Sequence, residues 1–257
     1  MSQDSYSERI GRLLYAKTDE KRVVTGVLTR LFAGRRFEHA LDVGAGPGLV
    51  TAPLAAAAKR LTIVEIDPGY RETLEKAFPA ATVVTDSIAR YAFPTRYDAI
   101  LCSQNLYYYP EAEWLPFCER LYGALAPGGL LVLVLNSDSG DWWRIVAPFW
   151  ERLRTHLRFH YVPTSRFVGE LAARLGPVER MPLKYRLTFD STAEIAEFIG
   201  RQALQIYDET VLQAHAGEFA RLAEALVAAN GGPVLNVDSE LVVASCASPG
   251  TPAGRSR

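Results

Sequence analysis

The sequence is short of cysteine, of basic surplus and of long apolar runs, and each shortage excludes a class of protein. Its three cysteines, Cys102, Cys118 and Cys246, are scattered and form no CxxC pair, which argues against a disulfide framework and a zinc site. Lysine and arginine total 28 against 29 acidic residues, so nothing favours nucleic acid or an anionic membrane as a partner. The apolar run at 130–135 is far too short to span a bilayer.

The two ends of the chain are polar. The first ten residues lack the apolar centre of a secretory signal, so we expect a cytoplasmic protein. Residues 247–257 are rich in glycine, proline and serine and are expected to be a disordered tail. We predict a single domain over residues 1–246, with a helical cap at 1–37 and a helical insertion at 191–232. A monomer and a homodimer are both compatible with the sequence.

Short apolar strands alternate with amphipathic helices from about residue 38 to 137. The expected strands are 40–43, 61–66, 81–85, 97–102 and 130–135, and the expected helices are 49–59, 70–78 and 111–125. Longer strands at 178–189 and 235–245 follow, separated by a helical block at 192–229. Near-continuous apolar strands that alternate with helices predict an α/β fold, in which helices cover both faces of a Rossmann-like, mainly parallel sheet.

The stretch "LDVGAGPGLVT" places Gly44, Gly46 and Gly48 at every second position directly after the first strand. Glycine permits unusual dihedral angles and lets a ligand approach the backbone closely. A strand, a glycine loop and a helix together aim free N–H groups at one crevice. The third glycine of a dinucleotide loop would stand at position 49, which is Leu49, so a pyrophosphate ligand is disfavoured.

Acidic residues follow at the ends of the next two strands. Glu65 in "VEIDP" is placed to accept the ribose hydroxyls of a nucleoside, with Asp67 as the competing acid. Asp86 in "TDSI" would accept the exocyclic amine of adenine or serve as a helix N-cap.

In this order and spacing, "LDVGAGPG", "VEID", "TDS" and "LAPGGLLVLVL" resemble the class I S-adenosylmethionine-dependent methyltransferases. The resemblance covers residues 38–137 and implies a seven-stranded sheet whose last strand is antiparallel, with S-adenosyl-L-methionine as cofactor. It implies that the methionine part of the cofactor lies along the glycine loop. The expected cofactor-binding residues are Gly44, Ala45, Gly46, Gly48, Glu65, Ile66, Asp86, Ser87 and Ser103.

The loop after the fourth strand, "CSQNLYYYP", narrows the class. It lacks the N/D-P-P-Y/F tetrapeptide of enzymes that methylate nucleic-acid bases and the paired glutamates of protein-arginine enzymes. Ser103, Gln104 and Asn105 replace the acidic ligands of catechol-type enzymes, so no metal is expected.

"QNLYYYP", "LNSDSGDWWRIVAPFW" and "LLYAKTDEK" are similar to segments of the histamine N-methyltransferase family. The resemblance implies catalytic roles for Asp19 as the acid that holds an amine, Gln104 as the amide and Tyr108 as an aromatic wall. Asp19 is one methylene shorter than the family's glutamate, and Glu20 lies beside it. The further expected substrate-binding residues are Tyr15, Tyr107, Trp142 and Trp143, with either Asn236 or Asp238 from the last strand.

The histidines offer few bases. His156 and His160 are four residues apart, as in a metal site on a helix, but no third ligand is evident. His215 in the helical insertion is a candidate base for an alcohol or phenol acceptor.

The preferred hypothesis is methylation of nitrogen on a small amine, imidazole or amino-acid-like metabolite by in-line displacement. The alternatives are O-methylation of an aromatic natural product and a catalytically silent cofactor-binding partner protein.

Overall fold

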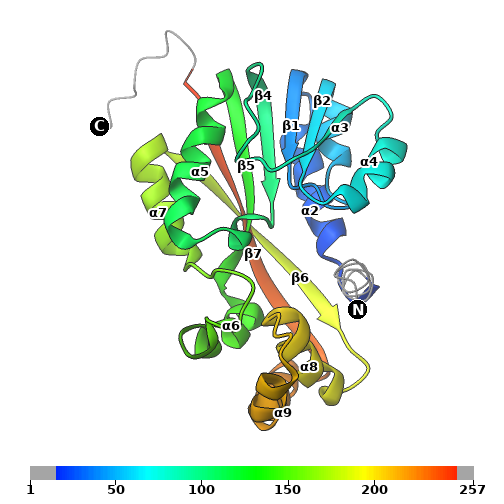
Figure 1. The fold of residues 1–257 in the computed structure, drawn as a ribbon, viewed down its shortest axis with the longest axis vertical. Helices are drawn as coiled ribbons and strands as arrows, with labels where there is room; N and C mark the ends of the chain where they lie inside the picture. Colours follow the sequence, from blue (N-terminus) through cyan, green and yellow to red (C-terminus); the bar gives the residue numbers. More distant parts are fainter. Residues whose placement is uncertain (1–15, 248–257) are drawn as a thin grey trace.

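The computed structural model describes residues 16–247. Within them a seven-stranded sheet has the order β3-β2-β1-β4-β5-β7-β6 and carries helices on both faces (Figure 1). The strands are β1 (Phe37–Val43), β2 (Ala58–Glu65), β3 (Thr82–Thr85), β4 (Tyr97–Ser103), β5 (Leu125–Ser139), β6 (Val178–Thr188) and β7 (Val234–Ser245). Tyr15, one of the expected substrate-binding residues, and residues 248–257 of the expected tail lie outside the described residues.

The sheet confirms the predicted fold class. Strands β1 to β5 pair in parallel, whereas β7 pairs antiparallel with both β5 and β6. In β4, Ala99 and Leu101 face one core while Ile100 and Cys102 face the other, because successive side chains of a strand point to opposite faces. Both faces are therefore buried, as the continuous apolar strands predicted.

Helices from different parts of the chain cover the two faces. One face packs against α2 (Glu20–Phe32), α3 (Ala52–Ala57) and α4 (Arg71–Ala77). The other packs against α5 (Glu111–Gly123) and α7 (Thr164–Leu175). The short 3₁₀ segments η1 (Pro68–Tyr70) and η2 (Leu106–Tyr108) follow β2 and β4.

A third core lies away from the main sheet and forms the lower part of Figure 1. It is built by α6 (Gly140–Leu153), α8 (Thr192–Phe198), the π-helix η3 (Ile199–Ala203) and α9 (Glu209–Asn230). These pack on the ends of β6 and β7 that extend beyond β5, through side chains such as Tyr185, Leu187 and Leu235. We call this group, residues 140–162 and 185–237, the acceptor unit.

Three predicted elements differ from the structure. The helix expected at 49–59 is only Ala52–Ala57, because residues 58–60 already pair with β1. The helix ending at 125 ends at Gly123, and residues 126–129 form an irregularity inside β5, where the register with β4 shifts. The helical segment after β5 ends at Leu153, so His156 and His160 do not share a helix face.

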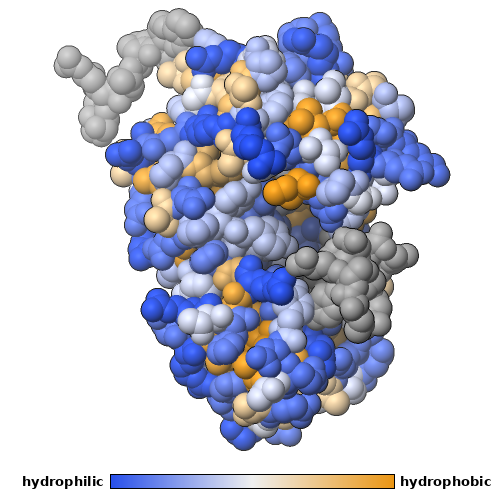
Figure 2. All heavy atoms as spheres, in the orientation of Figure 1, coloured by the Kyte–Doolittle hydropathy of each residue, from blue (hydrophilic) through white to orange (hydrophobic). Residues whose placement is uncertain are grey.

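The described residues include no helix that is both long and apolar enough to cross a membrane. The face shown in Figure 2 is mainly hydrophilic, with apolar side chains in small groups.

Candidate active site

A cavity of about 540 Å³ opens at the carboxyl ends of the parallel strands, between the main sheet and the acceptor unit. The chain leaves β1 toward β2 on one side and returns to β4 on the other, so the strand order reverses beside this cavity. Open α/β sheets bind their ligands at such a switch point. Residues after β1, β2, β3 and β4 line one wall, and the acceptor unit and the start of α2 line the other.

The glycine loop forms the floor of the cavity where β1 ends. Gly44, Gly46 and Gly48 have φ angles of 66°, 54° and 78°, a region that side chains rarely adopt. A Cβ on Gly44 would stand 1.9 Å from Asn105 Nδ2, and one on Gly48 would stand 2.7 Å from Phe78 Cε2. A Cβ on Gly46 would meet nothing within 4 Å. Gly46 therefore leaves open space for a ligand, whereas Gly48 serves packing and does not line the cavity.

Glu65, at the end of β2, lines the cavity and is only 7% exposed. Its Oε2 accepts from Gly46 N–H at 2.7 Å, and its Oε1 accepts from Asp67 N–H at 2.9 Å. Each carboxylate oxygen keeps a lone pair for a ligand hydroxyl. Asp67 instead accepts from Gly69 N–H and caps η1.

The end of β3 contributes Asp86 to the cavity. Its Oδ1 accepts from Ser87 N–H at 2.6 Å and from Arg90 Nε at 2.9 Å. The Arg90 guanidinium lowers the pKa of Asp86, so this carboxyl is ionised. Ser87 does not line the cavity, whereas Ile66, Ala45 and Ser103 do.

Asp42 lies buried beneath the glycine loop and also borders the cavity. Burial raises its pKa from 3.8 to about 7, and the hydrogen bond from Thr51 Oγ1, 2.6 Å long, opposes that rise. The nearby Glu65 carboxylate raises the pKa further.

This wall fits the donor cofactor that the sequence predicts. Glu65 offers acceptors for ribose hydroxyls, Gly46 leaves room against the backbone, and Ile66, which is 65% exposed, supplies apolar surface beside them. The acids Glu65, Asp67 and Asp86 surround this half of the cavity, and a sulfonium with an amino group is complementary to their negative charge.

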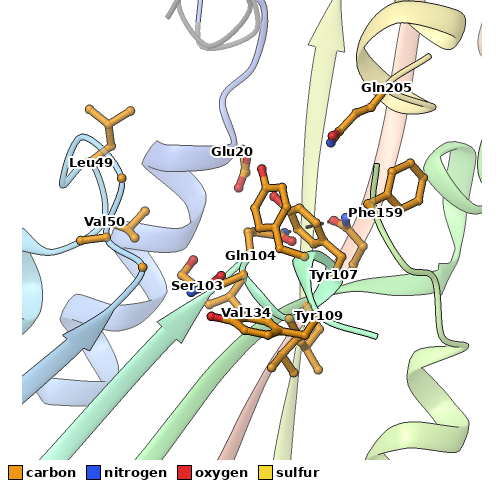
Figure 3. A pocket seen from close by; sticks show the side chains of 18 of the residues that line it. Glu20, Leu49, Val50, Ser103, Gln104, Tyr107, Tyr109, Val134, Phe159 and Gln205 are labelled. Carbon is orange, nitrogen blue, oxygen red and sulfur yellow. Dashed lines mark hydrogen bonds between the residues drawn. The ribbon is translucent and has the colours of Figure 1, made fainter. Parts of the chain in front are cut away.

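Gln104 stands at the end of β4 in a strained conformation, with φ at 51°. Its Nε2 donates to Asn136 Oδ1 at 3.0 Å, and its Oε1 is buried without a hydrogen-bond partner among the described residues. A buried carbonyl oxygen without a partner is costly, and strain of this kind concentrates at functional sites. Figure 3 shows Gln104 and Tyr107 facing the space toward which Glu20 extends.

The structure does not bring Asp19 into the cavity. Its Oδ1 accepts from Arg186 N–H at 2.8 Å and its Oδ2 accepts from Arg22 at 2.6 Å. Residue 18 forms a bridge with Leu187 of β6, which turns Asp19 toward the strand edge. Glu20, the first residue of α2, lines the cavity instead and is 8% exposed. Its carboxylate lies 2.9 Å from the Lys21 ammonium.

Aromatic side chains form much of the acceptor half of the cavity. Tyr107, Tyr108 and Trp142, which the sequence singled out, line it together with Phe159, which the sequence did not single out. Tyr108 is 57% exposed and lies at the mouth. Trp143 does not line the cavity, because its ring packs 5.2 Å from that of Tyr161.

The last strand does not supply the cavity-lining residue that was expected of it. Asn236 and Asp238 are both absent from the cavity wall; they bond to Asp141 and Ser139. Ser239 does not line the cavity either; its buried hydroxyl oxygen lies 3.2 Å from both Asn136 Oδ1 and Tyr185 Oη, and these two residues do line it.

Of the histidines, only His160 lines the cavity among the described residues. His215 pairs with Glu218 at 2.9 Å on α9, away from the cavity, so the structure does not place it as a base. The described residues contain no group of three or more His, Cys, Asp or Glu side chains that could hold a metal ion.

Comparisons with known proteins agree with this geometry. Residues 40–129 match the family model of the methyltransferase domain. Nodulation protein S of Rhizobium tropici is 31% identical over 106 residues, which are 39% of this chain and 44% of that protein. Trans-aconitate 2-methyltransferase of Methylobacterium radiotolerans is 27% identical over 165 residues, 61% of this chain and 58% of that protein. The matches thus span about half the length of these relatives.

Solved structures show the same fold. The N-methyltransferase NodS from Bradyrhizobium japonicum, in complex with S-adenosyl-L-homocysteine, is 17% identical, with 89% of this chain and 88% of that chain covered and a TM-score of 0.56. The finer resemblance to the histamine N-methyltransferase family stays a prediction. Residues 40–129 are thus similar to the methyltransferase domain, and the described chain shares the Rossmann-like fold of the solved methyltransferases.

Proposed function

We propose that this protein uses S-adenosyl-L-methionine to methylate a nitrogen atom of a small amine, imidazole or amino-acid-like metabolite. One observation carries the acceptor half of the proposal: the buried Glu20 carboxylate and the unpartnered Gln104 carbonyl line the same cavity as the glycine loop. Both groups accept hydrogen bonds, so they are complementary to N–H donors.

The charges of the cavity support the same acceptor. Its basic groups are already matched by acids: Lys21 contacts Glu20 at 2.9 Å, and Arg201 donates to Glu209 at 3.0 Å. Acids are in excess along the rest of the wall. A polar cationic metabolite therefore gains more from this site than a polyanion does.

When bound, the cofactor supplies a methyl group on a positively charged sulfur for in-line displacement. The chain supplies position and charge. Gln104 Oε1 accepts an N–H of the substrate and orients its lone pair, and orientation of this kind contributes about 7–11 kcal/mol. The nitrogen attacks as the free base; as the N–C bond forms and the C–S bond breaks, the positive charge passes from sulfur to nitrogen, where Glu20 stabilises it. The faces of Tyr107 and Trp142 exclude water and favour a cation by about 0.5–2 kcal/mol each.

The test is a steady-state assay with S-adenosylmethionine and a panel of biogenic amines, imidazoles and phenols, run on the wild type and on Glu20→Gln. Loss of a charge-assisted hydrogen bond costs about 1.5–3 kcal/mol, so kcat/KM for the amine should fall by about 10- to 150-fold. Cofactor affinity, measured by calorimetry, should stay unchanged. Glu72→Gln on the exposed face of α4 is the matched control. Equal kcat/KM in all three proteins would refute the role of Glu20.

Two observations favour methylation of a carboxylate: Lys21 lines the cavity, and one relative is a trans-aconitate 2-methyltransferase. Trans-aconitate therefore belongs in the panel. Its methylation, without methylation of any amine, would replace the amine proposal. Phenol turnover alone would favour the O-methyltransferase alternative, and cofactor binding without turnover of any compound would favour the silent partner protein.

A further inference from the structure

The wall that the acceptor unit contributes carries two more buried polar groups without partners. Gln202 Oε1 and Tyr161 Oη are both buried and have no hydrogen-bond partner among the described residues. Both residues line the cavity. The described residues contain four such side-chain atoms, and three of them belong to residues that line the cavity: Gln104, Tyr161 and Gln202. Buried polar groups are normally satisfied, so their gathering at one cavity points to a ligand.

Tyr161 is held firmly in place. It is 8% exposed, and its ring packs 5.2 Å from that of Trp143. Burial raises the pKa of its phenol far above the ordinary value, so the hydroxyl remains neutral and can both donate and accept a hydrogen bond.

The backbone around Gln202 is unusual. Gln202 lies in the π-helix η3, a form found frequently at functional sites. Gln205, which also lines the cavity, has φ at 50°, and Figure 3 shows it pointing into the cavity from the side of Phe159. A Cβ on Gly200 would stand 2.7 Å from Leu212 and 2.9 Å from Phe219. The π-helix is therefore packed tightly on α9, which fixes the position of Gln202.

We infer that Gln202 and Tyr161 form a second polar subsite, which binds a hydrogen-bonding group at the end of the acceptor remote from its reacting nitrogen. This inference rests on the proposed function, in which Glu20 and Gln104 hold the reacting amine. Phe159, Trp142 and Leu187 supply apolar walls in the same cavity. The substrate class is thus an amine with an apolar, preferably aromatic body and a distal O–H or N–H.

The test uses three probes that differ only at the distal end: tyramine carries a hydroxyl, 4-methoxyphenethylamine an acceptor without a donor, and 2-phenylethylamine neither. Binding is measured by calorimetry in the presence of S-adenosylhomocysteine, and turnover is measured with S-adenosylmethionine. The wild type should bind tyramine roughly 5- to 150-fold more tightly than 2-phenylethylamine, the range expected when a buried polar group loses its partner. The methoxy compound should bind less tightly than tyramine, because it cannot donate to Gln202.

Tyr161→Phe and Gln202→Met remove the polar atoms and keep the bulk. Each should reduce the preference for tyramine by about 2- to 12-fold, its share of the whole preference, and leave affinity for 2-phenylethylamine and for S-adenosylhomocysteine unchanged. Tyr122→Phe and Gln213→Met, which lie outside the cavity wall, are the matched controls and should keep the preference. Amine turnover without any preference in the wild type, or a preference that survives both cavity substitutions, would overturn the subsite alone. Failure of all three amines, with methylation of another amine or imidazole of the panel, would overturn the subsite alone; failure of every amine and imidazole in the panel would overturn the proposed function as well.

Discussion

Asp42→Asn tests whether the carboxyl group beneath the glycine loop is protonated, and so neutral, in the folded protein. Burial raises the pKa of Asp42 from 3.8 to about 7. Because the folded state binds this proton more tightly than the unfolded chain, the stabilisation is complete below pH 3.8 and is lost as the pH rises through about 7. Three pKa units correspond to ~4 kcal/mol. As the pH rises, the free energy of unfolding of the wild type should therefore fall by up to ~4 kcal/mol relative to that of Asp42→Asn.

The assay is urea unfolding of both proteins, without cofactor, from pH 4 to pH 9. The difference in the free energy of unfolding between the two should grow steadily in favour of Asp42→Asn and level off above pH 8. Thr51→Val removes the hydrogen bond that lowers the pKa of Asp42. In that background the difference in the free energy of unfolding should therefore level off at a higher pH. A difference that does not change with pH would show that Asp42 is ionised in the fold and would refute the reasoning.

The remaining predictions concern the glycine loop and the start of α2. Gly46→Ala places a methyl group in the open space where the cofactor is expected to bind. Calorimetry should show about tenfold or greater loss of S-adenosylmethionine affinity, ~1.4 kcal/mol or more. The free energy of unfolding should fall only by the ~1–2 kcal/mol of backbone strain. Gly48→Ala also meets Phe78 and should lose clearly more stability than Gly46→Ala; equal losses would contradict the assigned packing. Asp19→Asn weakens the anchor to Arg186 N–H, so Tm should fall by about 2–4 °C, as ~1 kcal/mol implies, and KM for the amine should rise while cofactor affinity stays constant. A fall in cofactor affinity with an unchanged KM for the amine would contradict this role of Asp19.

The donor half of the site was predictable because its signals are local. Gly44, Gly46 and Glu65 follow apolar strands directly, and the carboxyl ends of parallel strands meet at one edge of a sheet. The acceptor half depends on distant pairings. Whether Asp19 or Glu20 faces the cavity is decided by the bridge between Thr18 and Leu187, which no local pattern encodes.

The same reason explains two other differences. Gln202 becomes a site residue only because β6 and β7 extend beyond β5 and carry the helices between them to the cavity. Asn236 and Asp238 do not line the cavity because the side-chain direction in a strand reverses with each residue, and the register that sets Ser239 against Asn136 points its neighbours to the other face. A serine or glutamine in such a segment gives no signal of its own.

The separate core of the acceptor unit has an evolutionary consequence. Its apolar residues are packed among themselves, whereas the donor wall is supported by the two cores of the main sheet. Tyr107 is in contact with both the acceptor core and one of the sheet cores, and so joins the two halves. Substitutions in the separate core can therefore reshape the chamber for a new metabolite while the packing beneath the glycine loop stays unchanged.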